Sequence, residues 1–200
     1  PSGKLNETYP LHYEDTPAYE YYPSKERSSE YREGLYVGYR YYTTVGKKVR
    51  FPFGFGLSYT TFTYRDLTVD PEGVKFKIQN TGTVAGTEIA QLYVGKESDF
   101  VFRPLRELKG FARVELAPGE EKEVRILFDD KTFRFYDTRT DSWEVETGTY
   151  QIMIGSNAEE MLLEGSLAVN GTVTEGGYSR EELPEYFSGE IKNISDDTFR

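Results

Sequence analysis

Two carboxylates, Asp141 and Glu144, lie on either side of Trp143, the only tryptophan in the chain. A glycosidase needs only two carboxyl groups, one as general acid and the other as nucleophile or base. The alternative is structural: Trp143 and Val145 would share the buried face of a strand while both carboxylates point outward. We favour the structural interpretation, because the edge of a β-sandwich offers no pocket that would raise the pKa of one carboxyl group.

Other residue types that carry chemistry are scarce. His12 is the only histidine and there is no cysteine, which excludes histidine-based triads, di-histidine metal sites and thiolate ligands. Asp129-Asp130 and Asp196-Asp197 lack the spacing of a calcium loop. No phosphate loop or dinucleotide-binding fingerprint occurs. We therefore expect no catalytic residue, no cofactor and no metal site in this chain.

Aromatic rings and arginines are concentrated in YREGLYVGYRYY and FPFGF. One interpretation is a sugar-binding platform, in which tyrosine rings stack on pyranose faces. The other is an interface, in which the tyrosines bury area against a neighbouring domain, and the combination of aromatic residues with arginine favours it. The candidate interdomain contacts are Tyr31, Arg32, Glu33, Tyr36, Tyr39, Arg40, Tyr41, Phe53 and Phe55.

Residues 1–57 carry these rings on a segment without regular apolar periodicity. They hold ten of the 17 tyrosines and read as extended coil, with one short strand expected around Leu35–Tyr42. Pro52, Gly54 and Gly56 exclude a helix or a central strand in FPFGFG. An irregular segment that lays aromatic rings on a surface is expected there.

Residues 58–170 have the pattern of an all-β domain. Val74, Phe76 and Ile78 alternate with polar residues, as in a strand with one buried face. Similar short runs recur between turn residues, about seven in all, with no helix among them. The fold expected is a seven-stranded antiparallel sandwich of the immunoglobulin or fibronectin type III-like class.

Residues 171–200 form a tail that leads toward a further segment. Ser179 and Glu182 are spaced as a capping box, but Pro184 should limit any helix there to about one turn. The final SDDTFR has the pattern of a helix start.

Charge and hydropathy limit the classes of partner. The formal net charge is -10, which argues against nucleic acid, because phosphate binding needs a basic face. No run of apolar residues is long enough to cross a membrane. A soluble protein of bacterial type is expected, either cytoplasmic or secreted.

Seven motifs in order resemble one known family. They are PSGKL at 1–5, YREGLYVGYRYY at 31–42, FPFGFGLSYTTF at 51–62, NTGTVAGTEIAQLYV at 80–94, RPLRELKGF at 103–111, LAPGEEKEV at 116–124 and WEVETGTYQIMIGSN at 143–157. Together they are similar to the C-terminal part of glycoside hydrolase family 3, the β-glucosidase and β-xylosidase family. The resemblance implies the end of an α/β sandwich domain and a linker in 1–57, and a fibronectin type III-like domain in 58–170.

The same resemblance implies a parent enzyme that hydrolyses terminal β-linked glucose or xylose. Its nucleophile is an aspartate in a Ser-Asp-Trp motif, and Asp141-Ser142-Trp143 has a different order. No position here matches either catalytic carboxylate, so the chain should be inactive alone, as an accessory module. The expected partners are the catalytic domains of the same polypeptide, with weak oligosaccharide binding by the tyrosines or an adhesion-type sandwich as alternatives.

Overall fold

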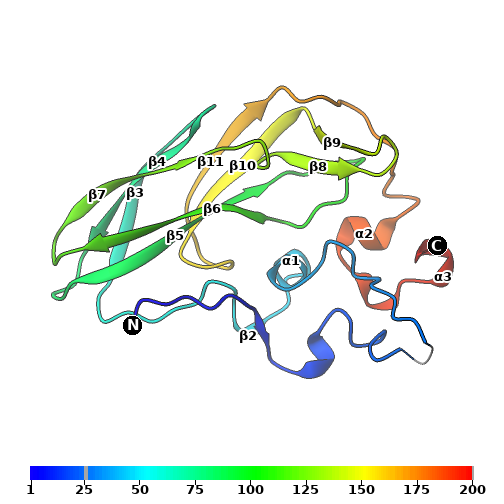
Figure 1. The fold of residues 1–200 in the computed structure, drawn as a ribbon, viewed down its shortest axis with the longest axis horizontal. Coiled ribbons are helices and arrows are strands. Elements are labelled where there is room, and N and C mark those ends of the chain that lie inside the picture. The colour runs from blue at the N-terminus through cyan, green and yellow to red at the C-terminus, as the bar shows by residue number, and fades with distance from the viewer. Residues whose placement is uncertain (25–26, 200) are drawn as a thin grey trace.

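The computed structural model describes residues 1–24 and 27–199. Seven antiparallel strands form two stacked sheets, with the remaining segments below and beside them (Figure 1). One sheet has the order β3–β4–β7, from Phe62–Asp70, Gly73–Asn80 and Glu121–Leu127. The other has the order β11–β10–β5–β6, from Met161–Val169, Gly148–Gly155, Gly86–Gly95 and Glu107–Leu116. The predicted seven-stranded, all-β fibronectin type III-like sandwich is confirmed.

The alternation of apolar residues determines which faces meet between the sheets. Val74, Phe76 and Ile78 of β4 are all buried in the main core, as the period of two predicts. They pack with Leu92 of β5 and Ile152 of β10 in the same core. This core lies wholly between the two sheets, and its thirteen buried side chains give the sandwich an interior of its own.

Strand β5 is buried on both faces, which explains its nearly continuous apolar sequence. Ala90 and Leu92 face the main core, while Tyr93 belongs to a second cluster on the outer face of the sheet. Tyr39 and Phe53 pack on that outer cluster. Residues 1–57, here called the strap, therefore cover one face of the sandwich.

The strap contains more regular structure than the sequence predicts. Two short strands, β1 (Tyr9–Pro10) and β2 (Val49–Phe51), pair with each other, and a 3-10 turn spans Tyr13–Asp15. The strand expected at Leu35–Tyr42 is wrong, because helix α1 (Tyr39–Thr44) begins within it.

Local geometry explains that difference. Gly38 directly before the helix has a φ of 58°, which ends any extended run and suits glycine. The helix then turns Tyr41 and Tyr42 into a buried cluster.

Residues 171–200, here called the tail, fold into three short elements. They are α2 (Pro184–Ser188), a 3-10 turn (Ile191–Asn193) and α3 (Asp196–Phe199). The Ser179 hydroxyl accepts a hydrogen bond from the Glu182 amide, but no helix follows there. Pro184 begins helix α2 instead of limiting an earlier one, because the first helical turn needs no amide donor. The helix expected in SDDTFR is confirmed over Asp196–Phe199.

The strap and the tail pack against each other in a third buried cluster. Tyr36, Tyr41 and Tyr42 from the strap meet Ile191 and Ile194 from the tail. In Figure 1 the blue strap and the red tail accordingly lie side by side, below the sandwich. No helix among the described residues is long and apolar enough to cross a membrane.

One further hairpin stands outside both sheets. Strands β8 (Arg134–Asp137) and β9 (Ser142–Val145) pair only with each other. The expectation that Trp143 fills the core is wrong, since its side chain is 56% exposed. A two-stranded hairpin has no second sheet to cover its outer face, so strand alternation alone does not bury the ring.

Candidate functional site

A hollow of about 420 Å³ opens between the β8–β9 hairpin, the loop around Arg103 and the Leu35–Arg40 part of the strap. Hereafter it is the hairpin hollow. Six of its lining side chains are aromatic: Phe100, Phe102, Phe135, Tyr136, Trp143 and Tyr178. Its volume lies within the range of about 300–1,000 Å³ typical of small-molecule sites.

The ring of Trp143 is held at the hollow by its two neighbours on β8. Arg134 lies over the indole with its Cζ 4.3 Å from the ring centroid, and Tyr136 meets it edge-on at 5.3 Å. The register pairs Tyr136 directly with Trp143 across the hairpin. The hydroxyl of Tyr136 in turn donates to Asp141 in the hairpin turn, and this bond raises the pKa of Tyr136. These contacts fix an exposed indole without burying it.

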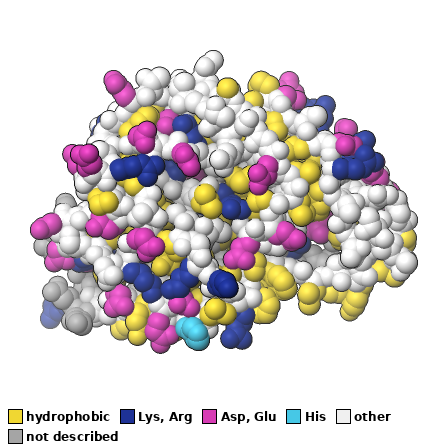
Figure 2. All heavy atoms as spheres, turned by 180° about the vertical axis from the view of Figure 1, so that it is seen from behind, with side chains coloured by type: hydrophobic (Ala, Val, Ile, Leu, Met, Phe, Trp, Pro, Cys, Tyr) yellow, Lys and Arg dark blue, Asp and Glu magenta, His cyan; other side chains and the backbone are white. Residues whose placement is uncertain are grey.

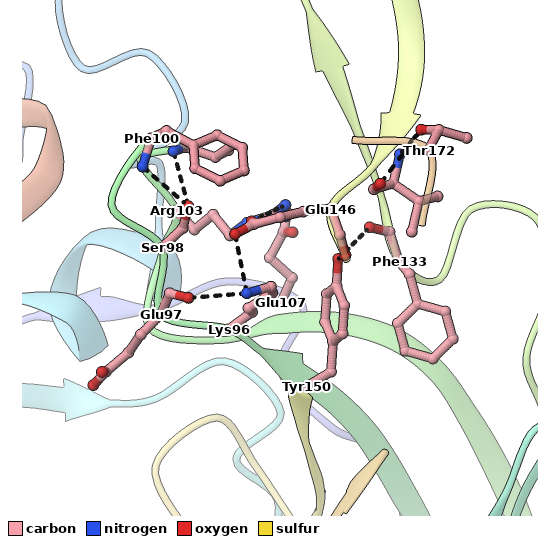
Figure 3. Close-up of polar contacts among 12 residues, drawn as sticks. Lys96, Glu97, Ser98, Phe100, Arg103, Glu107, Phe133, Glu146, Tyr150 and Thr172 are labelled. Carbon is pink, nitrogen blue, oxygen red and sulfur yellow. Dashed lines mark hydrogen bonds and ion pairs between the residues drawn. The ribbon is translucent and has the colours of Figure 1, made fainter. Parts of the chain in front are cut away.

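A buried ion cluster lies beside the hollow (Figure 3). The carboxylate of Glu146, only 3% exposed, is 3.0 Å from Lys96 Nζ and 3.1 Å from Arg103 Nη2. The hydroxyl of Tyr150 donates to the Glu146 carbonyl at 2.9 Å, and the guanidinium of Arg103 lies over the ring of Phe135. Both carboxylate oxygens are therefore engaged by cations, which suits a structural role and not proton transfer.

Neighbouring contacts hold the loop that carries Arg103. The Ser98 hydroxyl accepts hydrogen bonds from the amides of Phe100, at 3.2 Å, and Val101, at 3.0 Å (Figure 3). Such a side-chain-to-backbone turn fixes the loop without a helix or a strand. Arg103 thus reaches the hollow from a defined position.

The carboxylates that suggested glycosidase chemistry do not form an acid/base pair. Glu144 accepts hydrogen bonds from the hydroxyls of Thr172 and Ser142, and these lower the pKa of Glu144. A general acid needs a raised pKa, so this carboxylate is tuned in the opposite direction. Asp141 sits in the hairpin turn with a left-handed φ of 55°. Their side chains serve the turn and its junction with residue 172.

Asp137 is the most buried carboxylate of the hairpin. Burial would raise its pKa, but hydrogen bonds from the Arg139 guanidinium and from the Arg139 amide outweigh that effect and hold the pKa below its usual value. The group is therefore an ionised anchor for Arg139, which also lines the hollow.

The predicted interdomain residues divide into buried and exposed ones. Tyr36 and Tyr41 lie in the strap–tail cluster, and the Tyr36 hydroxyl donates to the Tyr186 carbonyl. Arg32 donates to the Ile194 carbonyl at 2.8 Å and pairs with Asp196. The other buried member is Glu33; the half-buried ones are Tyr39, Arg40, Phe53 and Phe55; Tyr31 is 75% exposed.

Three aromatic rings of the strap form a small group of tilted and edge-on contacts. Phe51 lies 4.9 Å from Phe55 and 6.4 Å from Tyr9, measured between ring centroids. Tyr59, just beyond the strap, is 84% exposed. Figure 2 shows apolar side chains along the lower edge of this face of the molecule, to one side of the single histidine, His12.

Sequence reasoning missed the hairpin hollow. Its residues come from segments far apart in the chain, such as Arg40, Arg103, Arg134 and Tyr178. The one local signal is the alternation of cations with aromatic residues in KTFRFYDTR, residues 131–139. Among the described residues, no group of three or more histidines and carboxylates is placed to hold a metal ion.

Comparison with known proteins gives three kinds of match. The fibronectin type III-like domain family matches residues 88–158. Thermostable beta-glucosidase B of Acetivibrio thermocellus is 46% identical over 181 residues, covering 86% of this chain and 24% of that protein. Probable beta-glucosidase K of Emericella nidulans is 45% identical over 179 residues, covering 88% of this chain and 21% of that protein.

Solved structures agree with these sequence matches. The crystal structure of a GH3 beta-glucosidase from Bifidobacterium adolescentis superposes with a TM-score of 0.82 at 36% identity, over 86% of this chain and 26% of that one. The chain spans about a quarter of the length of these relatives. By its ordered motifs, its sandwich and these matches, the chain carries a fibronectin type III-like domain and is similar to the corresponding part of β-glucosidases of glycoside hydrolase family 3.

Proposed function

We propose that this chain is a non-catalytic, domain-packing module of a family 3 enzyme. Its relatives are named β-glucosidases, which supports a parent that hydrolyses terminal β-linked glucose, with xylose as the other sugar of the family resemblance. Residues 1–57, 58–170 and 171–200 would then be the end of an α/β sandwich domain with its linker, the fibronectin type III-like domain, and a tail. The module's partners are the catalytic domains of the same polypeptide.

The two-sided strap is the observation that carries this proposal. Its inner side packs on the sandwich and on the tail. The strap and the adjoining residues to 59 also hold ten of the 17 large apolar side chains that are exposed on the described chain. Exposed apolar residues gathered in one segment mark an interaction surface. The catalytic domains are the partner that covers them.

The absence of a catalytic role rests on the carboxylates near the hollow. Glu146 is engaged by two cations, the pKa of Asp137 and of Glu144 is lowered, and Asp141 accepts from Tyr136. None of them is poised as a general acid beside a second, free carboxylate.

A chimera tests the packing role. The matching region of the Acetivibrio thermocellus enzyme is replaced by this chain, and hydrolysis of a chromogenic β-glucoside is measured together with the melting temperature. We expect the chimera to hydrolyse the glucoside and the isolated chain to be inactive. Tyr31→Ser and Tyr59→Ser should lower the melting temperature of the chimera and not that of the isolated chain, since both rings are exposed in the isolated chain.

The controls separate packing from chemistry. Glu144→Gln should leave the chimera's turnover unchanged, because Glu144 serves the hairpin. Turnover by the isolated chain that Glu144→Gln abolishes would overturn the non-catalytic role. An inactive but folded chimera would overturn the packing role.

Sugar binding by the strap tyrosines remains the alternative function, and the structure reduces the number of tyrosines that could contact a sugar. Tyr36, Tyr41 and Tyr42 are buried against the tail, which removes them from any flat, exposed row. No observation favours an adhesion role.

A further inference from the structure

The hairpin hollow reverses the charge balance of the chain. Six of its lining side chains are lysine or arginine and two, Glu107 and Asp137, are acidic. Two further carboxylates pair with lining arginines, Glu146 with Arg103 and Asp130 with Arg134, so six cations face four acidic groups. The whole chain has 24 basic and 34 acidic residues. A basic hollow on an acidic protein attracts anions while the rest of the surface repels them. The ligand that fits this hollow therefore carries negative charge.

Two arginines of the hollow also keep unmatched donors. The Nε atoms of Arg40 and Arg103 are buried and have no hydrogen-bond partner among the described residues. The Arg103 side chain is 10% exposed and is held by Glu146, so its guanidinium is already positioned. Both arginines line the hollow, and the paired donors of a guanidinium group suit a carboxylate bound there.

The mouth of the hollow presents aromatic rings. Trp143 is 56% exposed and Tyr136 is 45% exposed, although each contacts the other. Large amphipathic rings beside polar donors suit a ligand with one apolar face and many hydroxyl groups. A pyranose ring has this character, and about 420 Å³ is enough for such a ligand.

We infer that the hairpin hollow binds an acidic sugar, namely a hexuronic acid residue of an oligosaccharide. Its ring lies against Trp143 and its carboxylate faces Arg40 and Arg103. The choice of a carbohydrate rests on the proposed function, whereas the preference for an anion rests on the charges of the hollow itself. The packing module thereby gains a separate binding role toward acid-substituted glycans.

Calorimetric titration of the 200-residue chain tests this inference. The probes are methyl β-D-glucuronide, methyl β-D-glucoside and benzoate, each at the same ionic strength. We expect the glucuronide to bind with a Kd of about 1 mM or tighter, at least tenfold tighter than either other probe. Trp143→Ala and Arg40→Gln should each weaken it at least tenfold, since both positions are partly exposed and tolerate replacement.

Matched variants outside the hollow serve as controls. Tyr59→Ala removes another exposed ring and Arg125→Gln another exposed guanidinium, and both should bind the glucuronide like the parent chain. Glucuronide that binds no tighter than the glucoside would overturn the anion preference, and benzoate that binds equally well would overturn the sugar. Unchanged binding by both hollow variants would overturn the location. The chimera assay uses a neutral glucoside, so its outcome is independent of this one.

Discussion

The hydroxyl of Tyr21 accepts a hydrogen bond from the amide of Ile194 at 2.8 Å and donates one to the carbonyl of Lys192 at 2.9 Å. These bonds join the strap to the tail across more than 170 residues of sequence. Arg32 and Tyr36 extend the same contact by bonding to Ile194 and Tyr186. The two segments that flank the sandwich thus stabilise each other in a small aromatic core of their own.

Tyr36→Ala should destabilise this strap–tail core. The ring is fully buried, so truncation should cost about 3–5 kcal/mol of unfolding free energy. Urea unfolding combined with hydrogen exchange at Ile191 and Ile194 measures the loss in this core. Tyr31→Ala is the matched control, because its ring is 75% exposed and should cost no more than about 0.5 kcal/mol. Equal losses in the two variants would contradict a packed strap–tail core.

Trp143→Ala should leave the stability of the sandwich nearly unchanged, with a loss below about 1 kcal/mol for an exposed position. Tyr150→Ala should cost about 3–5 kcal/mol, because that ring lies in the main core. Thermal unfolding of both variants decides the point. A large loss of stability in Trp143→Ala would show that the indole lies in the core, as the sequence pattern predicts.

The strands of the sandwich could be predicted because their pattern is local. Val74, Phe76 and Ile78 alternate with polar residues in β4, and this alternation indicates which face of the strand is buried. The position of Trp143 could not be predicted, since the same alternation occurs in a strand of a sheet and in an isolated hairpin. The pairing partners of a strand decide which of these two arrangements it adopts, and β9 pairs only with β8.

Glu146→Gln should destabilise the chain by about 3–5 kcal/mol, because it leaves two largely buried cations, Lys96 and Arg103, without their anion. Denaturant unfolding measures this loss. Glu72→Gln is the control, since the Arg125–Glu72 pair is exposed and should contribute at most about 1 kcal/mol. Similar small losses in both variants would show that the Glu146 cluster is solvated.

Alkaline pH should destabilise the fold. Burial raises the pKa of Tyr42 and of Tyr150 to about 12, whereas tyrosine in an unfolded chain has a pKa of about 10. The folded state therefore keeps these protons between pH 10 and 12 while the unfolded state releases them, and the free energy of unfolding falls across that window. Below pH 10 these tyrosines keep their protons in both states, so their titration does not lower the free energy of unfolding there.

Thermal unfolding at intervals from pH 9 to pH 12 measures this dependence. Tyr42→Phe and Tyr150→Phe should each make the fall shallower, because phenylalanine has no proton to release. A melting temperature that stays constant to pH 12, or variants with the parent's slope, would contradict the assignment of these groups.

The strap shows a different limit of sequence reasoning. Its aromatic content and its irregular backbone at FPFGFG could be read from the sequence, and of the rings in that motif Phe53 packs on the outer face of the sandwich. That Tyr36 and Tyr41 are covered by the tail could not be read, because the contact joins segments about 150 residues apart. The hairpin hollow could not be predicted for the same reason, because its lining residues come from distant segments of the chain.

Hydrogen exchange of the strap, compared between the isolated chain and the chimera with the Acetivibrio thermocellus enzyme, tests the packing role most directly. Phe51 of the strap is 38% exposed in this chain, and Tyr59 just beyond the strap is 84% exposed. If the catalytic domains cover these rings, the amides of residues 49–59 should exchange at least tenfold more slowly in the chimera, while those of β4 stay the same. Equal exchange in the two proteins would contradict a strap that binds the catalytic domains.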